Sequence, residues 1–208
     1  MDYKNLLIRF ISSFILISLY FFLYINYSNK IFYLVTIIYL IIFLEILIFF
    51  KRYKLIIFSY IIISFLFVFL YFYSSFNPVE LTAIILCIAC FDSSSYFVGK
   101  KFGRNKILVN ISPNKTYEGL LGGVFFTNLV CLTIYFNIDL SKIGYNLFIL
   151  ANIVIIFSFF GDLIQSYFKR LNFLKDSGNF FPGHGGFFDR FDSFLLVIIP
   201  ISILNLLF

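Results

Sequence analysis

The sequence predicts an all-α, polytopic membrane protein with about seven transmembrane helices. Of its 208 residues, 62% are hydrophobic and only 12% are charged, whereas a soluble domain is usually about half apolar. Apolar stretches recur along the chain, and each is long enough to cross about 30 Å of hydrocarbon as a helix of roughly 20 residues. We therefore expect a lipid bilayer around this chain and no nucleic acid among its partners.

Short polar segments separate the expected spans. Lys4 and Arg9 lie at or just before the start of the first apolar run, as basic residues do in a signal peptide. The run is longer than the apolar part of a signal peptide and lacks a small-residue cleavage site, so we expect a membrane anchor. In chain order, the spans are residues 6–27, 31–50, 54–76, 79–100, 116–136, 144–168 and 188–207.

Positive charge is distributed unevenly over the two sides that seven spans create. Lysine and arginine mark the cytoplasmic side of a membrane protein. Most of them fall at the N-terminus and in the loops near 51–54, 100–115 and 169–187, while the opposite loops contain Lys30 and Lys142. This pattern predicts a cytoplasmic N-terminus and a C-terminus on the outer side.

The first three spans contain one acidic residue, Glu45. A carboxyl group inside a span is a functional candidate by default. Arg52, seven residues further along the same helical face, offers a neutralising partner. We favour a structural role for Glu45 over a functional one.

The fourth span opens with Asn77-Pro78-Val79-Glu80. A cap residue, a proline in the first turn and an acid three residues beyond the cap are typical of a helix start, so we expect Glu80 to be structural. Near the end of this span, Asp92, Ser95, Tyr96 and Gly99 share one face. An isolated carboxylate is costly in hydrocarbon, so this face must look into protein or water. A stabilising hydrogen bond between helices is the alternative to the functional role that we favour.

A basic segment, Ser112–Gly119, leads into the fifth span, which carries Gly122 and Gly123. Ser112 or Thr116 can serve as a helix cap, and glycines allow neighbouring helices to approach closely. Free amides, hydroxyl groups and Lys115 at a helix N-terminus also suit an anion. We expect phosphate to bind here.

Acids recur at one depth in the last two spans. Asp162 precedes Lys169 by seven residues and so lies roughly 10 Å deep on the cytoplasmic half, with Ser166 one turn later on the same face. Asp189 and Asp192 are three residues apart and project to the same side. Spans four, six and seven thus each supply an acid to one leaflet.

Carboxylates without a set of histidine or cysteine partners form an oxygen site that suits Mg²⁺ rather than Zn²⁺. Lysine and arginine beside them suit phosphate oxygens. Together they point to nucleotide-dependent phosphoryl or nucleotidyl transfer, in which positioning and charge neutralisation provide most of the catalysis. At this depth, a soluble nucleotide can meet a lipid phosphate.

The sequence of the loop Pro182–Gly186 allows two interpretations, an ordinary turn or an anion-binding loop. Proline and glycine are ordinary turn residues, but glycines also let backbone amides approach an anion closely. His184 in this loop either contacts a phosphate or holds the loop together.

Three motifs resemble those of the phosphatidate cytidylyltransferase family, also called CDP-diacylglycerol synthases. The longest consists of Ser166–Arg170, Lys175–Gly178 and Pro182–Asp192, and it is similar to the family's C-terminal motif. Ser112–Gly119 and Asp92–Gly103 resemble two further blocks, so the likeness covers about residues 80–200. The sequence departs from the family at Tyr117, where tryptophan is common, and at Ser93–Ser95, which replace smaller residues. It is also one or two N-terminal spans shorter than most bacterial members.

The resemblance implies a reaction of CTP with phosphatidate that yields CDP-diacylglycerol and pyrophosphate, as a step of phospholipid biosynthesis. It implies Mg²⁺ and, as in similar enzymes, K⁺, a homodimer, and a site that faces the cytoplasm at a bacterial inner membrane. We accordingly divide the chain into N-terminal transmembrane helices, residues 1–76, and a catalytic region with cytoplasmic loops, residues 77–208.

The resemblance also implies roles for individual residues. For the metal it implies Asp162 and Asp189, to which we add Asp192 and Asp92. The catalytic group is Asp162, Asp189, His184, Lys169 and Arg190. The substrate-binding group is Ser112, Lys115, Thr116, Glu118, Ser166, Arg170, Lys175, Asp176, Gly185 and Gly186.

Two alternatives remain. A CTP-dependent polyprenol or phytol kinase would use the same nucleotide with a lipid alcohol, and its products would be CDP and a phosphorylated lipid. An ion transporter would also place acids within spans, but it would not need the basic, glycine-rich segment Lys169–Gly186.

We expect a reporter fused to the C-terminus to lie outside the cytosol, because seven spans and the positive-inside rule place that end on the outer side. Parallel fusions to alkaline phosphatase and green fluorescent protein measure this location. A fluorescent C-terminal fusion without phosphatase activity would contradict the topology.

Overall fold

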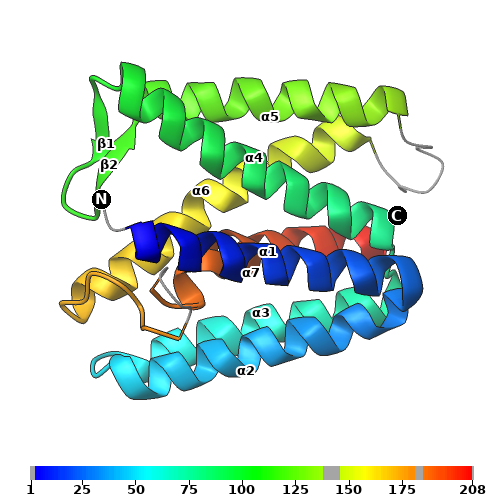
Figure 1. The fold of residues 1–208 in the computed structure, drawn as a ribbon, viewed down its shortest axis with the longest axis horizontal. Coiled ribbons are helices and arrows are strands. Elements are labelled where there is room, and N and C mark those ends of the chain that lie inside the picture. Colours follow the sequence, from blue (N-terminus) through cyan, green and yellow to red (C-terminus); the bar gives the residue numbers. More distant parts are fainter. Residues whose placement is uncertain (1–2, 138–145, 181–184, 208) are drawn as a thin grey trace. The chain divides into compact units, whose positions relative to one another are not determined.

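The computed structural model describes residues 3–137, 146–180 and 185–207. Within these ranges, each predicted span corresponds to a helix (Figure 1). Helices are expected because a backbone in lipid must satisfy its own hydrogen bonds. In chain order the elements are α1 (Tyr3–Asn26), a short 3₁₀ helix (Ser28–Lys30), α2 (Ile31–Phe49), α3 (Lys54–Ser74), α4 (Pro78–Phe102), β1 (Lys106–Leu108), β2 (Ser112–Thr116), α5 (Tyr117–Asn137), α6 (Leu147–Leu171) and α7 (Phe188–Leu207).

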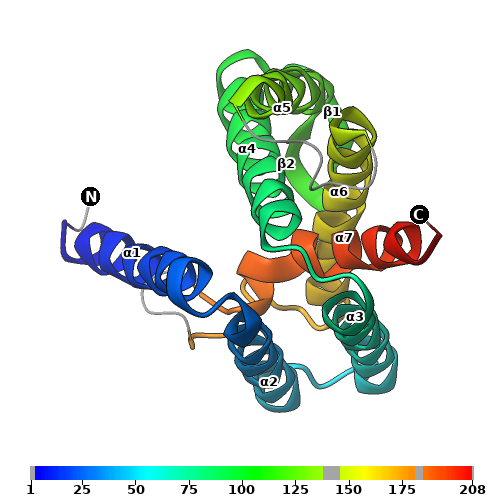
Figure 2. The ribbon, with the colours of Figure 1, turned by 90° about the vertical axis from the view of Figure 1, so that its right-hand side faces the viewer.

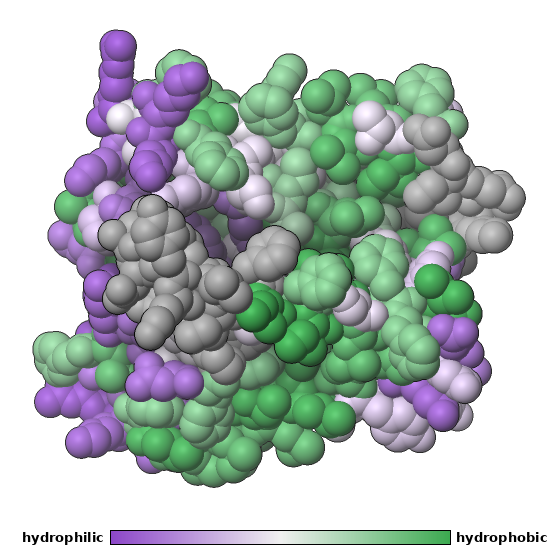
Figure 3. Space-filling model, in the orientation of Figure 1, coloured by the Kyte–Doolittle hydropathy of each residue, from purple (hydrophilic) through white to green (hydrophobic). Residues whose placement is uncertain are grey.

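The helices have the length and composition of membrane spans. Among the described residues, six are long and apolar enough to cross a membrane, and α1 contributes a shorter apolar segment, Ile11–Asn26. Apolar side chains cover the visible length of α5 in Figure 3, while hydrophilic ones gather over the β-hairpin. The predicted all-α, polytopic class is therefore confirmed.

The hairpin of β1 and β2 was not predicted, since a loop and a helix start were expected there. Its strands are antiparallel, with Lys106 opposite Thr116 and Leu108 opposite Ser112. The Glu118 carboxylate holds its base, because it accepts hydrogen bonds from the backbone amides of Arg104, at 3.1 Å, and Asn105, at 3.2 Å.

The chain forms two compact units. The first comprises Met1–Ile63 and Phe168–Phe191, and the second comprises Ser64–Tyr167 and Asp192–Phe208. The division at residue 76 that the sequence suggested concerned catalytic roles, and it stays a prediction.

In the first unit, α2 buries one apolar face. Ile31, Val35, Ile38, Ile42 and Ile46 are all buried and follow one another at intervals of three or four residues. This spacing places them on the same side of a helix. Their burial fixes which way α2 faces.

In the second unit, the start of α4 confirms the predicted cap. The Asn77 side chain accepts a hydrogen bond from the amide of Val79 at 3.0 Å. Glu80 is buried, and its carboxylate accepts from the Tyr71 hydroxyl at 3.2 Å and from the Asn205 amide at 3.0 Å. Glu80 thus joins α3, α4 and α7 within this unit, in agreement with its predicted structural role.

Helices α4 and α5 lie side by side, with the hairpin near one end of the pair (Figures 1 and 2). Glycine at the contact makes this approach possible, as expected for helices in membranes. A Cβ atom at Gly122 would lie 2.5–2.7 Å from the side-chain carbons of Val98. The branched Val98 side chain has little freedom to move away.

Replacing Gly122 by leucine is expected to destabilise the second unit by about 1–3 kcal/mol, the usual cost of inserting carbon atoms into a packed contact. Thermal unfolding of the purified protein in detergent measures this loss. Leu121 is 68% exposed on the same helix, so Leu121→Ala is the matched control and should unfold near the wild-type temperature. An unchanged melting temperature in Gly122→Leu would show that the contact is loose.

Candidate active site

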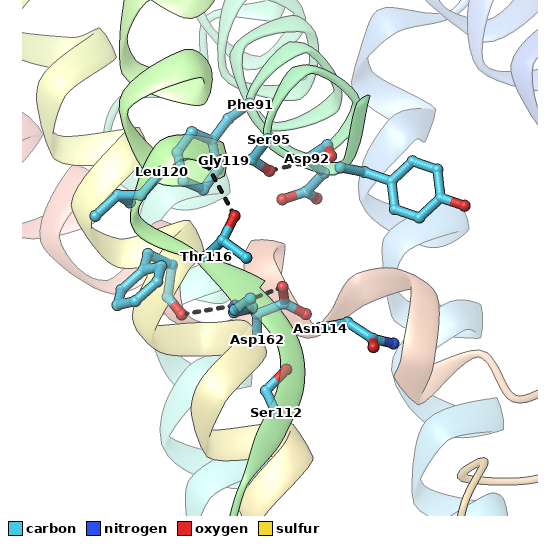
Figure 4. Close-up of a pocket in the computed structure, with 12 residues that line it drawn as sticks. Phe91, Asp92, Ser95, Ser112, Asn114, Thr116, Gly119, Leu120 and Asp162 are labelled. Carbon is cyan, nitrogen blue, oxygen red and sulfur yellow. Dashed lines mark hydrogen bonds and ion pairs between the residues drawn. The ribbon is translucent and has the colours of Figure 1, made fainter. Parts of the chain in front are cut away.

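A cavity of about 220 Å³ lies in the second unit, where residues of α4, β2, α5 and α6 come together. Figure 4 shows Asp92 from α4 and Asp162 from α6 at this cavity, with Thr116 of β2 between them. The lining residues are Phe91, Asp92, Ser95, Tyr96, Ser112, Asn114, Lys115, Thr116, Gly119, Leu120, Phe159 and Asp162. The cavity therefore combines two acids, a base and several hydroxyl groups with an apolar wall.

The polar face of α4 looks into this cavity, as predicted. Asp92, Ser95 and Tyr96 line it, and a Cβ atom at Gly99 would lie 3.0 Å from the Thr116 hydroxyl. The Ser193 hydroxyl of α7 donates a hydrogen bond to the Asp92 carboxylate at 3.4 Å. Asp92 thus has a weak protein partner and is directed toward the space where a ligand would lie.

Strand β2 delivers Lys115 to Asp162. Its ammonium group lies 2.7 Å from the Asp162 carboxylate, and the two side chains are 20% and 35% exposed. The same group donates to the Phe159 carbonyl at 3.4 Å and lies over the Phe159 ring, 4.7 Å from its centre. These contacts hold the Lys115 side chain against α6.

Thr116 acts as the helix cap that the sequence suggested. Its hydroxyl accepts a hydrogen bond from the amide of Gly119 at 3.1 Å. Free amides at the start of a helix favour an anion, and this helix start belongs to the cavity lining.

A third acid lies close to the two acids of the lining. Asp192 of α7 is buried, and it lies near enough to Asp162 and Asp92 for charge on those acids to act on its carboxyl group. Acids that face one another away from water repel unless a proton or a cation lies between them. These three acids, on three different helices, are therefore the candidates in the second unit for holding a cation.

Oxygen-only donors match the preference of Mg²⁺. In the parts of the chain that the structure describes, no group of three or more His, Cys, Asp or Glu side chains has the geometry of a metal site. The fit to Mg²⁺ therefore rests on the chemistry of the three carboxyl groups and on their mutual proximity.

In the first unit, Asp189 is held by two donors. The Lys169 ammonium group lies 2.7 Å from one carboxylate oxygen, and the amide of Ser177 donates to the other at 2.7 Å. The Lys169 and Asp189 side chains are only 14% and 11% exposed. Gly185, whose φ of +89° suits glycine, packs beside both Asp189 and Asp176.

Asp162 and Asp189 belong to different units, and each is described with its own neighbours. Their pairing at one metal stays a prediction. The structure does place each of them against a lysine of its own unit.

The other predicted residues occupy varied positions. Glu118 lies outside the cavity lining and holds the hairpin base. Ser166 is half-buried, Gly186 is buried and His184 lies outside the described residues. The exposed members of the substrate-binding and catalytic groups are Arg170, Lys175, Asp176 and Arg190.

The sequence alone missed Ser193, Asn114 and Phe159 as neighbours of the cavity acids. Ser193 directly follows Asp192, so its position at the end of the long motif was an available signal. Asn114 lies inside the basic segment and had a comparable signal. Phe159 is one of 33 phenylalanines and carried none.

Comparison with known proteins identifies the family. The sequence matches the Cytidylyltransferase family over residues 2–208. Over 116 residues it is 44% identical to the phosphatidate cytidylyltransferase of Staphylococcus aureus (strain COL), and these residues make up 54% of this chain and 44% of that protein. Over 108 residues it is 47% identical to the phosphatidate cytidylyltransferase of Bacillus subtilis (strain 168), and these residues make up 51% of this chain and 40% of that protein. These matches span less than half the length of either relative. Because the family match extends over nearly the whole sequence, the chain belongs to the Cytidylyltransferase family.

Proposed function

We propose that this protein transfers CMP from CTP to phosphatidate and forms CDP-diacylglycerol and pyrophosphate. The observation that carries the proposal is the cavity that Asp92, Asp162 and Lys115 line together, between helices long and apolar enough to span a membrane. The names of the relatives from Staphylococcus and Bacillus support the same reaction. The site would face the cytoplasm of a bacterial inner membrane, where CTP is available.

Asp92, Asp162 and Asp192 would hold Mg²⁺ in this proposal. The ion would neutralise phosphate charge at the reacting centre. Lys115, which neutralises Asp162 in the structure, would turn to the phosphate oxygens once a cation takes its place. By the family resemblance, Asp162 and Asp189 would be the paired acids of the metal, and Asp189 has Lys169 beside it.

The reaction is a direct displacement. An unesterified oxygen of the phosphatidate phosphate forms a bond to the α-phosphorus of CTP. The bond from that phosphorus to the oxygen bridging the β-phosphate breaks, and pyrophosphate leaves with the bridging oxygen and its electron pair. Positioning and charge neutralisation supply most of the catalysis in such transfers.

The lipid kinase differs from this proposal in its products, and the ion transporter differs in its need for substrates. The hydroxyl groups and amides around Lys115 suit the phosphates of a nucleotide and a lipid. A cation pathway alone gives no reason for that arrangement.

Purified protein supplied with labelled CTP, phosphatidate and Mg²⁺ is expected to release pyrophosphate and to label CDP-diacylglycerol. Thin-layer chromatography of the lipid products measures the label, and omission of Mg²⁺ is the control. Release of CDP with a phosphorylated lipid alcohol would favour the kinase. Cation transport without consumption of CTP would favour the transporter.

Asp162→Asn and Asp189→Asn are each expected to lower kcat by at least about 100-fold, the effect of losing a group that stabilises charge in the transition state. Steady-state assays on equal amounts of folded protein measure the loss. Glu80→Gln is the matched control, since Glu80 is a buried acid whose observed partners, Tyr71 and Asn205, are structural. Full Mg²⁺-dependent activity in both Asp variants would reject these acids as metal ligands.

A further inference from the structure

Glu45 of α2 is fully buried in the first unit. One carboxylate oxygen accepts a hydrogen bond from the backbone amide of Phe187 at 2.9 Å, and the other accepts from the amide of Phe188 at 3.0 Å. Phe188 is the first residue of α7. Glu45 therefore binds the start of a helix that lies more than 140 residues further along the chain.

This contact corrects the partner that the sequence suggested. In the described part of the chain, the Arg52 guanidinium lies over the Phe173 ring, 4.9 Å from its centre, and Glu45 is bound by α7 instead. The first amides of a helix have no partner within the helix, and the N-terminal end of a helix carries partial positive charge. A buried carboxylate satisfies both requirements at once.

Two glycines bring the backbone against this carboxylate. A Cβ atom at Gly178 would lie 3.0 Å from a Glu45 oxygen, and one at Gly186 would lie 2.8 Å from the other oxygen. A Cβ at Gly186 would also collide with the Ser177 hydroxyl. The backbone at Gly178 and at Gly186 can thus lie this close to Glu45 only because neither residue has a side chain.

The same segments hold Asp189. Ser177, whose amide donates to the Asp189 carboxylate at 2.7 Å, directly precedes Gly178. Phe188, whose amide donates to Glu45, directly precedes Asp189. Of the two backbone segments that set the position of Asp189, one is therefore hydrogen-bonded to Glu45 and the other packs against it.

We propose that Glu45 is a positioning residue: it clamps the N-terminus of α7 and the segment Ser177–Gly178, and so fixes the Asp189 carboxylate against Lys169. The expected effect on turnover rests on the proposed function. The clamp itself rests only on contacts within the first unit.

A clamp and a purely structural acid differ in what their loss changes. Glu45→Gln keeps the size of the side chain but replaces one acceptor oxygen by an amide donor, which cannot accept from an α7 amide. Loss of the clamp would loosen the start of α7 locally and displace Asp189. The matched control is Glu80→Gln, since Glu80 is a second buried acid, bound by Tyr71 and Asn205 in the other unit.

The test measures two quantities in purified wild-type protein, Glu45→Gln and Glu80→Gln. The first is hydrogen–deuterium exchange of the peptide that covers residues 185–195, which reports on the amides of Phe187 and Phe188 whether or not the protein turns over substrate. The second is kcat for CDP-diacylglycerol formation, with the Mg²⁺ concentration that gives half-maximal rate.

For Glu45→Gln, we expect faster exchange in that peptide, a kcat lower by about tenfold or more, which corresponds to about 1.4 kcal/mol in the barrier, and a higher Mg²⁺ requirement. Glu80→Gln should retain the wild-type values of all three. If Glu45→Gln does not fold, Gly178→Ala, which pushes a methyl group toward the Glu45 carboxylate, should change exchange and kcat in the same direction.

Wild-type exchange in Glu45→Gln, or in Gly178→Ala if that variant is used, would overturn the clamp. Faster exchange with an unchanged kcat and Mg²⁺ requirement would overturn the positioning role. A wild-type protein that forms no CDP-diacylglycerol would reject the proposed function instead, and the exchange data would still decide whether Glu45 holds α7.

Discussion

The structure depends on one constraint: an acid placed within apolar helices must find its partner inside the protein. In hydrocarbon, an unpartnered carboxylate is costly. Glu45 and Glu80 meet this requirement with neutral donors, namely backbone amides for the first and a hydroxyl and an amide group for the second. Asp162 and Asp189 meet it with lysines.

Asp92 and Asp192 meet the requirement less completely. Asp92 accepts a long hydrogen bond from the Ser193 hydroxyl at 3.4 Å, and Asp192 accepts a hydrogen bond from the amide of Ser193 at 2.9 Å and lies near the charge of Asp162. Both of these bonds come from Ser193, and neither acid forms a salt bridge in the part of the chain that the structure describes. Asp92 lines the cavity that also contains Lys115 and Asp162, and Asp192 lies close to both of these cavity acids, which links the packing of the second unit to its proposed chemistry.

Much of the fold followed from the sequence, because long apolar runs in a membrane have few alternatives to helices. The start of α4 was also predictable, since Asn77 and Pro78 act locally. The hairpin was not. Its strands have three and five residues, and its base is held by Glu118, which follows the second strand and binds the backbone amides just before the first.

The site was predictable in its residue types and only partly in its contacts. The sequence indicated that Asp92 and Asp162 belong to a polar region with Lys115, and the cavity brings these three together. It gave the wrong partner for Glu45, because a neighbour seven residues away on one helix was weighed while the true partner is the start of α7. Local spacing identifies neighbours along a helix, whereas contacts between distant helices depend on packing that no motif encodes.

The central claim is that the acids of the second unit form a cation site, and Mn²⁺ binding in the absence of substrates tests it most directly. Mn²⁺ prefers the same oxygen donors as Mg²⁺, and electron paramagnetic resonance reports the Mn²⁺ that remains free. We expect the wild-type protein to bind Mn²⁺, Mg²⁺ to displace it, and the double variant Asp92→Asn with Asp192→Asn to bind it much more weakly. Equal binding of Mn²⁺ by the folded double variant and the wild type would contradict the claim.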